Sequence, residues 1–579
     1  MFDRPVRTGL KPILLACVAG VSLLASPALA QSVDSTKLLQ LMVAKGLVSQ
    51  AEADALIAEA TVAQPAAKPA LPPVPPAGVA DGVQTIAYVP AVVRDQIKAE
   101  LRAELGQQAQ AEGWSRPGET PEWTRRLSPY GDLRVRGEGV FMDDGNADIF
   151  EDFGAINAGD PQNINDKTPG YVGPPYLNTR ENRQRARIRA RLGLHAMIDD
   201  WISADLRLAT GNDTSPISTN QTLGSSEGFG KYQIWLDRAS LRLTPVKGLN
   251  IDVGRFANPF WTSEILFDDD LNFDGVAVSG QQKLGDRFAV FGTAGAFPIF
   301  NTSLDFGSRN APEGQGGPYE SKDKYLLAGQ LGLEWQATEK LRVRLAAGYF
   351  NFDGVGGEVS KPCQFYEVVC DTDPTRPQFQ QFGNTLFPIR NVVANPLDPI
   401  GSPENQYFGL VSDFEVLNVR GSAEMALGGG SRVRLDGEYI KNLGLKEGRM
   451  RALAVNNLGP TRTIPDPNNT NGTLLVPGTW EGGSEGWATK LTVGKLDLIA
   501  RGDWNLQFGY RYLESDAVVD GFTDSDFHMG GTNSKGWTAG GAYAFGKSTS
   551  IGFRWLSGEE IADAPLSVDK LFIDLQTRF

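Results

Sequence analysis

The feature that most constrains this chain of 579 residues is an alternation of apolar and polar residues that begins after Trp123 and recurs to the C-terminus. Arg432-Val433-Arg434-Leu435-Asp436 is one example, and Leu133-Arg134-Val135-Arg136 is another. A period of two places successive side chains on opposite faces of a β-strand. Residues 123–579 are therefore predicted to form strands with one apolar and one polar face.

About sixteen segments share this period, and short and long connections alternate between them. They lie near 128–141, 180–197, 201–209, 232–246, 249–255, 274–281, 286–297, 324–336, 340–351, 414–427, 431–442, 485–493, 498–513, 536–545, 549–557 and 569–579. Turns such as Gly428-Gly429-Gly430 join some pairs, and long polar segments join the others. This arrangement is typical of an all-β, up-and-down antiparallel barrel that spans a membrane.

The final segment indicates which face meets lipid. Its odd-numbered positions from Leu571 to Phe579 are mostly apolar, and a terminal aromatic of this kind resembles the C-terminal signal of bacterial outer-membrane barrels. With the apolar set outward, Asp574 and Arg578 face the lumen. Candidates for the aromatic girdles at the membrane interfaces are Trp504, Tyr510, Tyr512, Trp537, Tyr543 and Trp555.

Five arginines share one face of the second segment, and we call them the arginine row: Arg183, Arg185, Arg187, Arg189 and Arg191. A lipid-facing arginine near the bilayer midplane costs roughly 2–4 kcal/mol, so the row is predicted to line a hydrated lumen. It could form a wall network with Asp132, Glu138 and Asp205. It could also form a track for anions, and the two roles are compatible. Further pore-lining candidates are Arg134, Arg136, Arg207, Arg342, Arg344 and Arg434.

The segment 256–273 joins the fifth and sixth predicted strands and is unusually apolar for a solvent loop. By analogy with sixteen-stranded porins, we expect it to fold inward as a constriction loop. Its acids would then face the arginine row: Glu264, Asp268, Asp269 and Asp270. Asp270, Asn272 and Asp274 also match the start of a calcium loop, but Gln281 stands where the acidic twelfth ligand belongs. A turn is favoured over a Ca²⁺ site, and no cofactor is expected.

The N-terminal part has a different organisation. Residues 1–30 are predicted to be a signal peptide, with a basic start, an apolar stretch and an Ala28-Leu29-Ala30 cleavage site, although Cys17 leaves a lipoprotein signal as an alternative. Residues 31–62 are predicted to form a helical hairpin, and 63–90 an Ala/Pro-rich linker. Residues 91–122 are predicted to form an amphipathic helix, either a packed stalk or a coiled coil.

Composition excludes several classes of protein. The net charge of −14 argues against nucleic acid as a partner. Cys363 and Cys370 would be the only thiols after signal cleavage, and export favours a disulfide between them over a metal site. His195 and His528 are the only histidines, and neither lies in a nucleophile motif, so no enzymatic activity is expected.

Three stretches resemble the putative porin family of proteobacterial outer membranes: Leu38-Leu39-Gln40-Leu41 through Ala55-Leu56-Ile57, Arg185 to Gly211, and Gly254-Arg255-Phe256-Ala257-Asn258-Pro259-Phe260 through Asp274-Gly275. The resemblance covers essentially the whole exported chain and implies a passive channel without naming a solute. The arginine row and the helical N-terminal region are also similar to those of phosphate-selective porins.

We therefore expect an outer-membrane porin of a Gram-negative bacterium, surrounded by lipid, with a periplasmic N-terminal region and a monomeric or homotrimeric state. It would pass small hydrophilic solutes or ions, with anion preference from the arginine row. One alternative is a channel selective for phosphate or another anion. Another is an envelope protein whose N-terminal helices bind peptidoglycan or a periplasmic partner.

Overall fold

The computed structural model describes residues 122–307, 319–465 and 473–579, together with Lys98. The predicted signal peptide, helical hairpin and linker lie outside the described residues, as does nearly all of the predicted helix 91–122. The first element described is a single helical turn, α4 (Glu122–Arg125), directly before the first strand.

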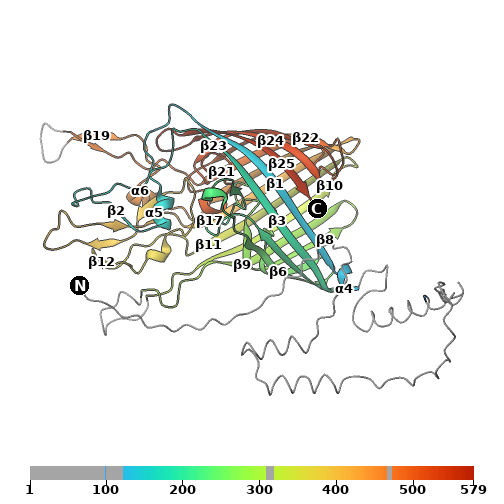
Figure 1. Cartoon of the computed structure of the whole chain (residues 1–579), viewed down its shortest axis with the longest axis horizontal. Coiled ribbons are helices and arrows are strands. Elements are labelled where there is room, and N and C mark those ends of the chain that lie inside the picture. The colour runs from blue at the N-terminus through green and yellow to red at the C-terminus, as the bar shows by residue number, and fades with distance from the viewer. Residues whose placement is uncertain (1–97, 99–121, 308–318, 466–472) are drawn as a thin grey trace, which may run out of the picture. The chain divides into compact units, whose positions relative to one another are not determined.

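Sixteen antiparallel strands form a closed ring, as the sequence predicts (Figure 1). In order around the ring they are β1 (Leu127–Met142), β3 (Arg183–Asp199), β4 (Ile202–Ala209), β6 (Trp235–Val246), β7 (Leu249–Ala257), β8 (Asn272–Leu284), β9 (Phe288–Phe300), β10 (Lys324–Gln336), β11 (Leu341–Asp353), β17 (Phe414–Gly428), β18 (Ser431–Asn442), β21 (Glu485–Gly494), β22 (Trp504–Leu513), β23 (Ser534–Ala544), β24 (Thr549–Glu560) and β25 (Ser567–Arg578). The ring closes where β25 pairs with β1, in a register that sets Arg136 opposite Asp574.

Each predicted strand corresponds to one strand of the ring. The largest difference is at β22, which begins at Trp504 rather than near 498. The side chain of Asp503 accepts hydrogen bonds from the backbone N–H groups of Ile499 and Ala500, at 3.0 and 2.8 Å. These local bonds hold the preceding residues in a turn, so the strand begins only after them.

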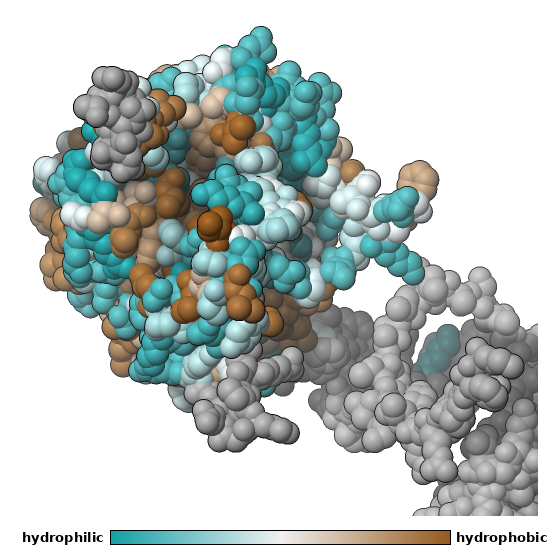
Figure 2. Space-filling model, turned by 90° about the vertical axis from the view of Figure 1, so that its left-hand side faces the viewer, coloured by the Kyte–Doolittle hydropathy of each residue, from teal (hydrophilic) through white to brown (hydrophobic). Residues whose placement is uncertain are grey.

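Short connections lie at one end of the ring and long ones at the other. Between β17 and β18 the chain turns through Gly428, Gly429 and Gly430, whose φ angles of 102°, 57° and 76° suit glycine. The long connections carry small elements: α5 (Phe153–Ala158), β2 (Gln162–Asn163), β5 (Gln221–Thr222), η1 (Glu227–Phe229), β12 (Pro362–Gln364), η3 (Asp373–Thr375), β13 (Leu386–Pro388), β14 (Asn391–Val393), β15 (Asn405–Gln406), β16 (Phe408–Leu410), α6 (Glu447–Leu453), β19 (Arg462–Pro465), β20 (Thr473–Val476) and η4 (Asp520–Phe522). Figure 2 shows hydrophilic and hydrophobic residues interspersed over this long-loop end.

The outside of the ring is apolar. Leu192 is 55% exposed and Leu331 is 76% exposed, whereas the residues directly before and after each of them in the strand, which point inward, are buried or half-buried. Among the girdle candidates, Trp504, Trp537 and Tyr543 are exposed. This distribution is what a barrel needs when hydrocarbon surrounds it. Within the described residues, no helix combines the length and the apolar character required to cross a membrane.

The largest hydrophobic cluster lies inside the ring, where the β7–β8 connection packs against the wall. Phe260 and Phe267 of this connection meet Phe350 of β11 at ring-centroid distances of 5.1 and 5.5 Å. Phe267 also meets Phe273 of β8 at 5.0 Å. Edge-to-face contacts of this kind stabilise beyond the area they bury, so the connection is fixed inside the lumen.

Candidate functional site

The β7–β8 connection, residues 258–271, crosses the interior of the barrel, and we call it the constriction loop. Trp261 exchanges two hydrogen bonds with the side chain of Gln330 on β10, both of 2.9 Å between its backbone N or O and the amide atoms. The backbone N–H of Ser263 donates to Glu438 on β18, with an N···O distance of 2.8 Å. Because β18 lies five strands from β8 around the ring, the loop must span part of the lumen.

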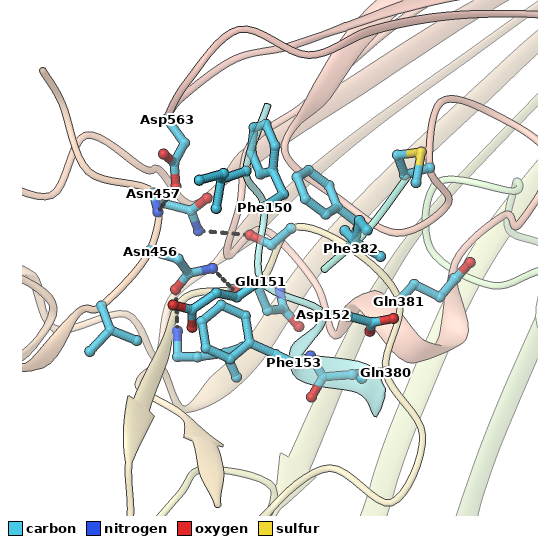
Figure 3. Close-up of a pocket in the computed structure, with 18 residues that line it drawn as sticks. Phe150, Glu151, Asp152, Phe153, Gln380, Gln381, Phe382, Asn456, Asn457 and Asp563 are labelled. Atoms are coloured by element: carbon cyan, nitrogen blue, oxygen red, sulfur yellow. Dashed lines mark hydrogen bonds between the residues drawn. The ribbon is translucent and has the colours of Figure 1, made fainter. Parts of the chain in front are cut away.

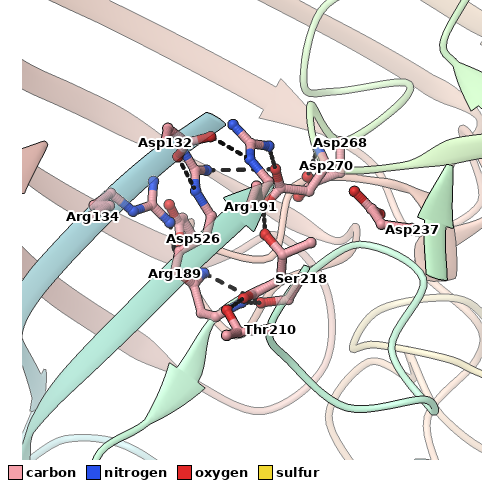
Figure 4. Close-up of polar contacts among 12 residues, drawn as sticks. Asp132, Arg134, Arg189, Arg191, Thr210, Ser218, Asp237, Asp268, Asp270 and Asp526 are labelled. Atoms are coloured by element: carbon pink, nitrogen blue, oxygen red, sulfur yellow. Dashed lines mark hydrogen bonds and ion pairs between the residues drawn. The ribbon is translucent and has the colours of Figure 1, made fainter. Parts of the chain in front are cut away.

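The four predicted acids of this loop point in different directions. Asp270 is 3.0 Å from Arg191 and 3.5 Å from Arg189, measured between carboxylate oxygen and guanidinium nitrogen (Figure 4). Glu264 and Asp269 instead line a cavity of about 300 Å³ against the β17–β24 wall, which we call the inner cavity. The expectation that all four acids face the arginine row is therefore corrected, since only Asp270 contacts it.

Asp268 is buried within the loop structure. Its carboxyl accepts hydrogen bonds from the backbone N–H of Asp270 at 2.7 Å and of Ser525 at 3.2 Å. Burial raises the pKa of Asp268 to about 9, and the nearby carboxylate of Asp524 adds to the shift. Asp268 is thus a neutral acid at pH 7.

Most of the arginine row is ion-paired with the neighbouring strand. Arg189 and Arg191 share Asp132 of β1, at 2.9 and 2.5 Å, and Arg185 and Arg187 share Glu138. These two acids are the predicted wall partners. Predicted partner Asp205 does not contact the row: it accepts a 2.8 Å hydrogen bond from the Tyr130 hydroxyl and lies 4.0 Å from Nδ1 of His195.

Next to the row, the two arginines of β1 differ in their partners. Arg136 is 1% exposed and binds two carboxylates, Asp574 at 2.7 Å and Asp526 at 3.0 Å. Asp526 also pairs with Arg554 of β24. Among the described residues, no carboxylate oxygen lies within 4.0 Å of the Arg134 guanidinium nitrogens, and Arg134 donates instead to the side-chain oxygen of Asn220 at 2.6 Å.

The remaining pore-lining candidates are distributed over three strands. Their partners are Asp237 for Arg207, Glu334 for Arg342 and Arg344, and Asp436 for Arg434. Arg344 also lies over the ring of Trp261, 4.2 Å from its centroid, so it supports the constriction loop from the wall.

Two basic residues of the cavity were not predicted, Arg420 on β17 and Lys490 on β21. Within the described part of the chain, neither has a carboxylate oxygen within 4.0 Å, and Nη1 of Arg420 lacks any hydrogen-bond partner. Arg420 lies over Trp261 at 4.7 Å. In the sequence, both residues alternate with residues that face lipid, so this alternation could have identified them as facing the lumen.

Two larger spaces lie toward the long-loop end. One cavity of about 1000 Å³ is lined by Trp235, Asp237, Arg255, Val519 and Phe522, among others, and we call it the outer cavity. A pocket of about 410 Å³ lies among the loops (Figure 3). Its lining includes Glu151, Asp152 and Asp563, together with three phenylalanines, and contains no lysine or arginine. The chemistry of this pocket does not suit an anion.

The remaining residues singled out in the sequence form contacts within the protein that stabilise the fold. Cys363 and Cys370 form a disulfide within the β11–β17 connection. Within residues 122–307, 319–465 and 473–579, no group of three or more His, Cys, Asp and Glu side chains could hold a metal ion. In the calcium-like segment, Asn272 bonds to Asp237 and Arg238, and Asp274 pairs with Arg255. His528 is buried, and burial lowers its pKa to about 3.

Comparison with known proteins gives one family. The family model described as "Putative porin" matches residues 33–579. No curated protein matches the chain.

Several solved structures resemble this chain. The outer membrane channel DcaP of Acinetobacter baumannii is 10% identical, with 78% of this chain and 97% of that chain covered and a TM-score of 0.35. OprB of Pseudomonas putida is 10% identical, with coverages of 79% and 95% and a TM-score of 0.38. OmpT of Vibrio cholerae, in a trimer form, is 10% identical, with coverages of 78% and 99% and a TM-score of 0.34.

Proposed function

We propose that this chain, which belongs to the putative porin family, forms a water-filled outer-membrane channel for passive diffusion of small hydrophilic solutes, with a preference for anions. The closed ring has an apolar exterior and a charged interior. Charged side chains on a lumen wall are stable only where water or counter-charges reach them. A hydrated pathway is consistent with the cavity that the constriction loop lines and with the outer cavity toward the long-loop end.

The observation that carries anion preference is an excess of guanidinium groups on one wall. Eight arginines gather there, namely Arg134 and Arg136 of β1, the five of the arginine row, and Arg554. Their carboxylate partners are five: Asp132, Glu138, Asp270, Asp526 and Asp574. Pores lined by unbalanced arginine or lysine favour anions.

The constriction loop carries less negative charge than its composition suggests. Asp268 is neutral at pH 7 because burial raises its pKa to about 9. Asp270 is balanced by Arg189 and Arg191. Only Glu264 and Asp269 remain to face Arg420 and Lys490 across the inner cavity. The constriction loop therefore adds little negative charge opposite the positive wall.

The test is a reversal-potential measurement on purified full-length protein in a planar bilayer under a KCl gradient. We expect ion-conducting steps and a reversal potential of the anion-preferring sign, which Lys490→Gln moves toward zero. Lys495→Gln is the matched control, because Lys495 follows the same strand but lies in the exposed turn, bonded to the carbonyl of Gly429. Absence of conducting steps would refute the channel, and a cation-preferring sign would refute the anion preference. Replacing chloride by phosphate measures whether phosphate is favoured.

A further inference from the structure

The β22–β23 connection, residues 514–533, also folds into the barrel, and we call it the second loop. Ser515, Asp516, Ala517, Thr523 and His528 are each at most 1% exposed, although they belong to a connection at the long-loop end. Some of their polar groups bond to distant parts of the chain, as where the backbone N–H and the hydroxyl of Thr385 both donate to the Asp516 carboxylate. Burial this complete indicates an ordered structure rather than a solvent loop.

The second loop is joined to the constriction loop by three hydrogen bonds. The N–H of Asp268 donates to the carbonyl of Phe522 at 2.8 Å, and the N–H of Asp524 donates to the carbonyl of Glu264 at 3.0 Å. The N–H of Ser525 donates to the side chain of Asp268 at 3.2 Å. Because these three hydrogen bonds join the two loops, neither loop can move away from the other without breaking them.

Two wall contacts hold the second loop from different sides. Phe522 stacks on Phe352 of β11 with a centroid distance of 5.9 Å. Four residues later, Asp526 is held by Arg136 of β1 and Arg554 of β24. In the ring order, β11 and β1 lie seven or more strands apart in either direction. The second loop thus bridges the interior.

The bridge also separates two spaces. Val519 and Phe522 line the outer cavity of about 1000 Å³. Asp524 and Phe527 line the inner cavity of about 300 Å³, together with Glu264 of the constriction loop. No residue lines both cavities. The second loop therefore lies between the two cavities, since it supplies lining residues to each.

We propose that the constriction of this channel is composite: the second loop sets the width of the pore together with the constriction loop, and Asp526 is the positioning residue that holds it in the lumen. The inference rests on the proposed channel function. It adds the second loop as a further determinant of the pore width, and this loop is held by Arg136, Arg554 and Phe352.

The test compares two isosteric substitutions in full-length protein by single-channel conductance. Asp526→Asn removes the charge that holds the second loop, whereas the control Asp574→Asn removes the other partner of Arg136 from the barrel wall and leaves the loop bonded. Both remove one negative charge next to the same guanidinium. Each substitution alters the wall charge equally, so we expect the conductance of Asp526→Asn to exceed that of Asp574→Asn roughly twofold, because only the first widens the narrowest point of the pore.

A second variant guards against failure of the first to fold, which heat-dependent gel migration would reveal. Phe522→Ala loosens the opposite anchor and should also raise conductance, with Phe545→Ala at the exposed turn as its control. Wild-type conductance in Asp526→Asn and Phe522→Ala would overturn the composite constriction while leaving the channel intact. A wild-type protein that conducts no ions would instead refute the proposed function.

Discussion

Replacing Arg136 by glutamine tests the charge network that lines the barrel. The guanidinium group is 1% exposed and donates from Nε and Nη2 to Asp574, at 2.7 and 3.0 Å, and from Nη1 to Asp526 at 3.0 Å. It also lies 4.3 Å from the ring centroid of Phe572. Arg136→Gln leaves two carboxylates without their shared counter-charge. Breaking a buried ion pair from one side costs roughly 3–5 kcal/mol, so the free energy of unfolding should fall by about that amount.

The assay is urea unfolding in lipid vesicles, followed by tryptophan fluorescence at several pH values. The control is Arg432→Gln, whose side chain is 47% exposed in its pair with Glu424. An exposed pair contributes about 0–1 kcal/mol, so this variant should differ little from wild type.

The loss in Arg136→Gln should depend on pH. Burial alone would raise the pKa of Asp526, but Arg136 and Arg554 outweigh it and hold that pKa well below its ordinary value of 3.8. A depressed carboxyl pKa contributes stability above the unfolded value, and that stability is lost as the pH falls below it. The deficit of the variant should therefore be full at pH 7 and shrink at pH 4 and below. A deficit equal to that of Arg432→Gln, or one that does not change with pH, would refute the reasoning.

Three further predictions use other parts of the molecule. Because burial raises the pKa of Asp268 to about 9, the stability contributed by its neutral form is complete at low pH and is lost as the pH rises toward 9. The conductance of the wild type should change with a midpoint near pH 9, because ionised Asp268 repels Asp524. A conductance that does not change with pH, as expected for Asp268→Asn, would contradict this. Leu192→Arg on the lipid-facing side of β3 should cost roughly 2–4 kcal/mol in vesicle unfolding, whereas lumen-facing Gln507→Arg should cost less, and equal losses would reverse our assignment of faces. Replacing Cys363 and Cys370 by serine should speed proteolysis of the β11–β17 connection, because opening a disulfide loop this short lowers the free energy of unfolding by about 2 kcal/mol. Conductance should not change, and a change would place that connection in the pore.

The barrel could be predicted from the sequence because its signal is local. A period of two needs only neighbouring residues to be read, and lipid outside with water inside enforces it along every strand. The same parity placed the arginine row and its partners Asp132 and Glu138 on one face. It also extends to Arg420 and Lys490, which were not predicted although the parity of their strands marks them.

The interior loops could be predicted only in part. The constriction loop has a dense apolar composition, which favours burial, and its position between the fifth and sixth strands is confirmed. The direction of each of its acids was not predictable, because it depends on contacts with β3 and the second loop. The second loop has the composition of a solvent segment, with Ser515, Asp516 and Thr523 among its most buried residues. Some of their partners lie more than a hundred residues away, as Thr385 does from Asp516, so no local pattern marks their burial.

The seam between β25 and β1 determines whether the barrel is closed. Gly131 and Phe579 exchange two backbone hydrogen bonds, of 2.9 and 3.0 Å, directly beyond the register in which β25 pairs with β1. Without β25, both β24 and β1 would present unpaired backbone amides to the bilayer, and hydrocarbon does not tolerate such groups. A chain that lacks this one strand therefore has no closed cylinder to insert.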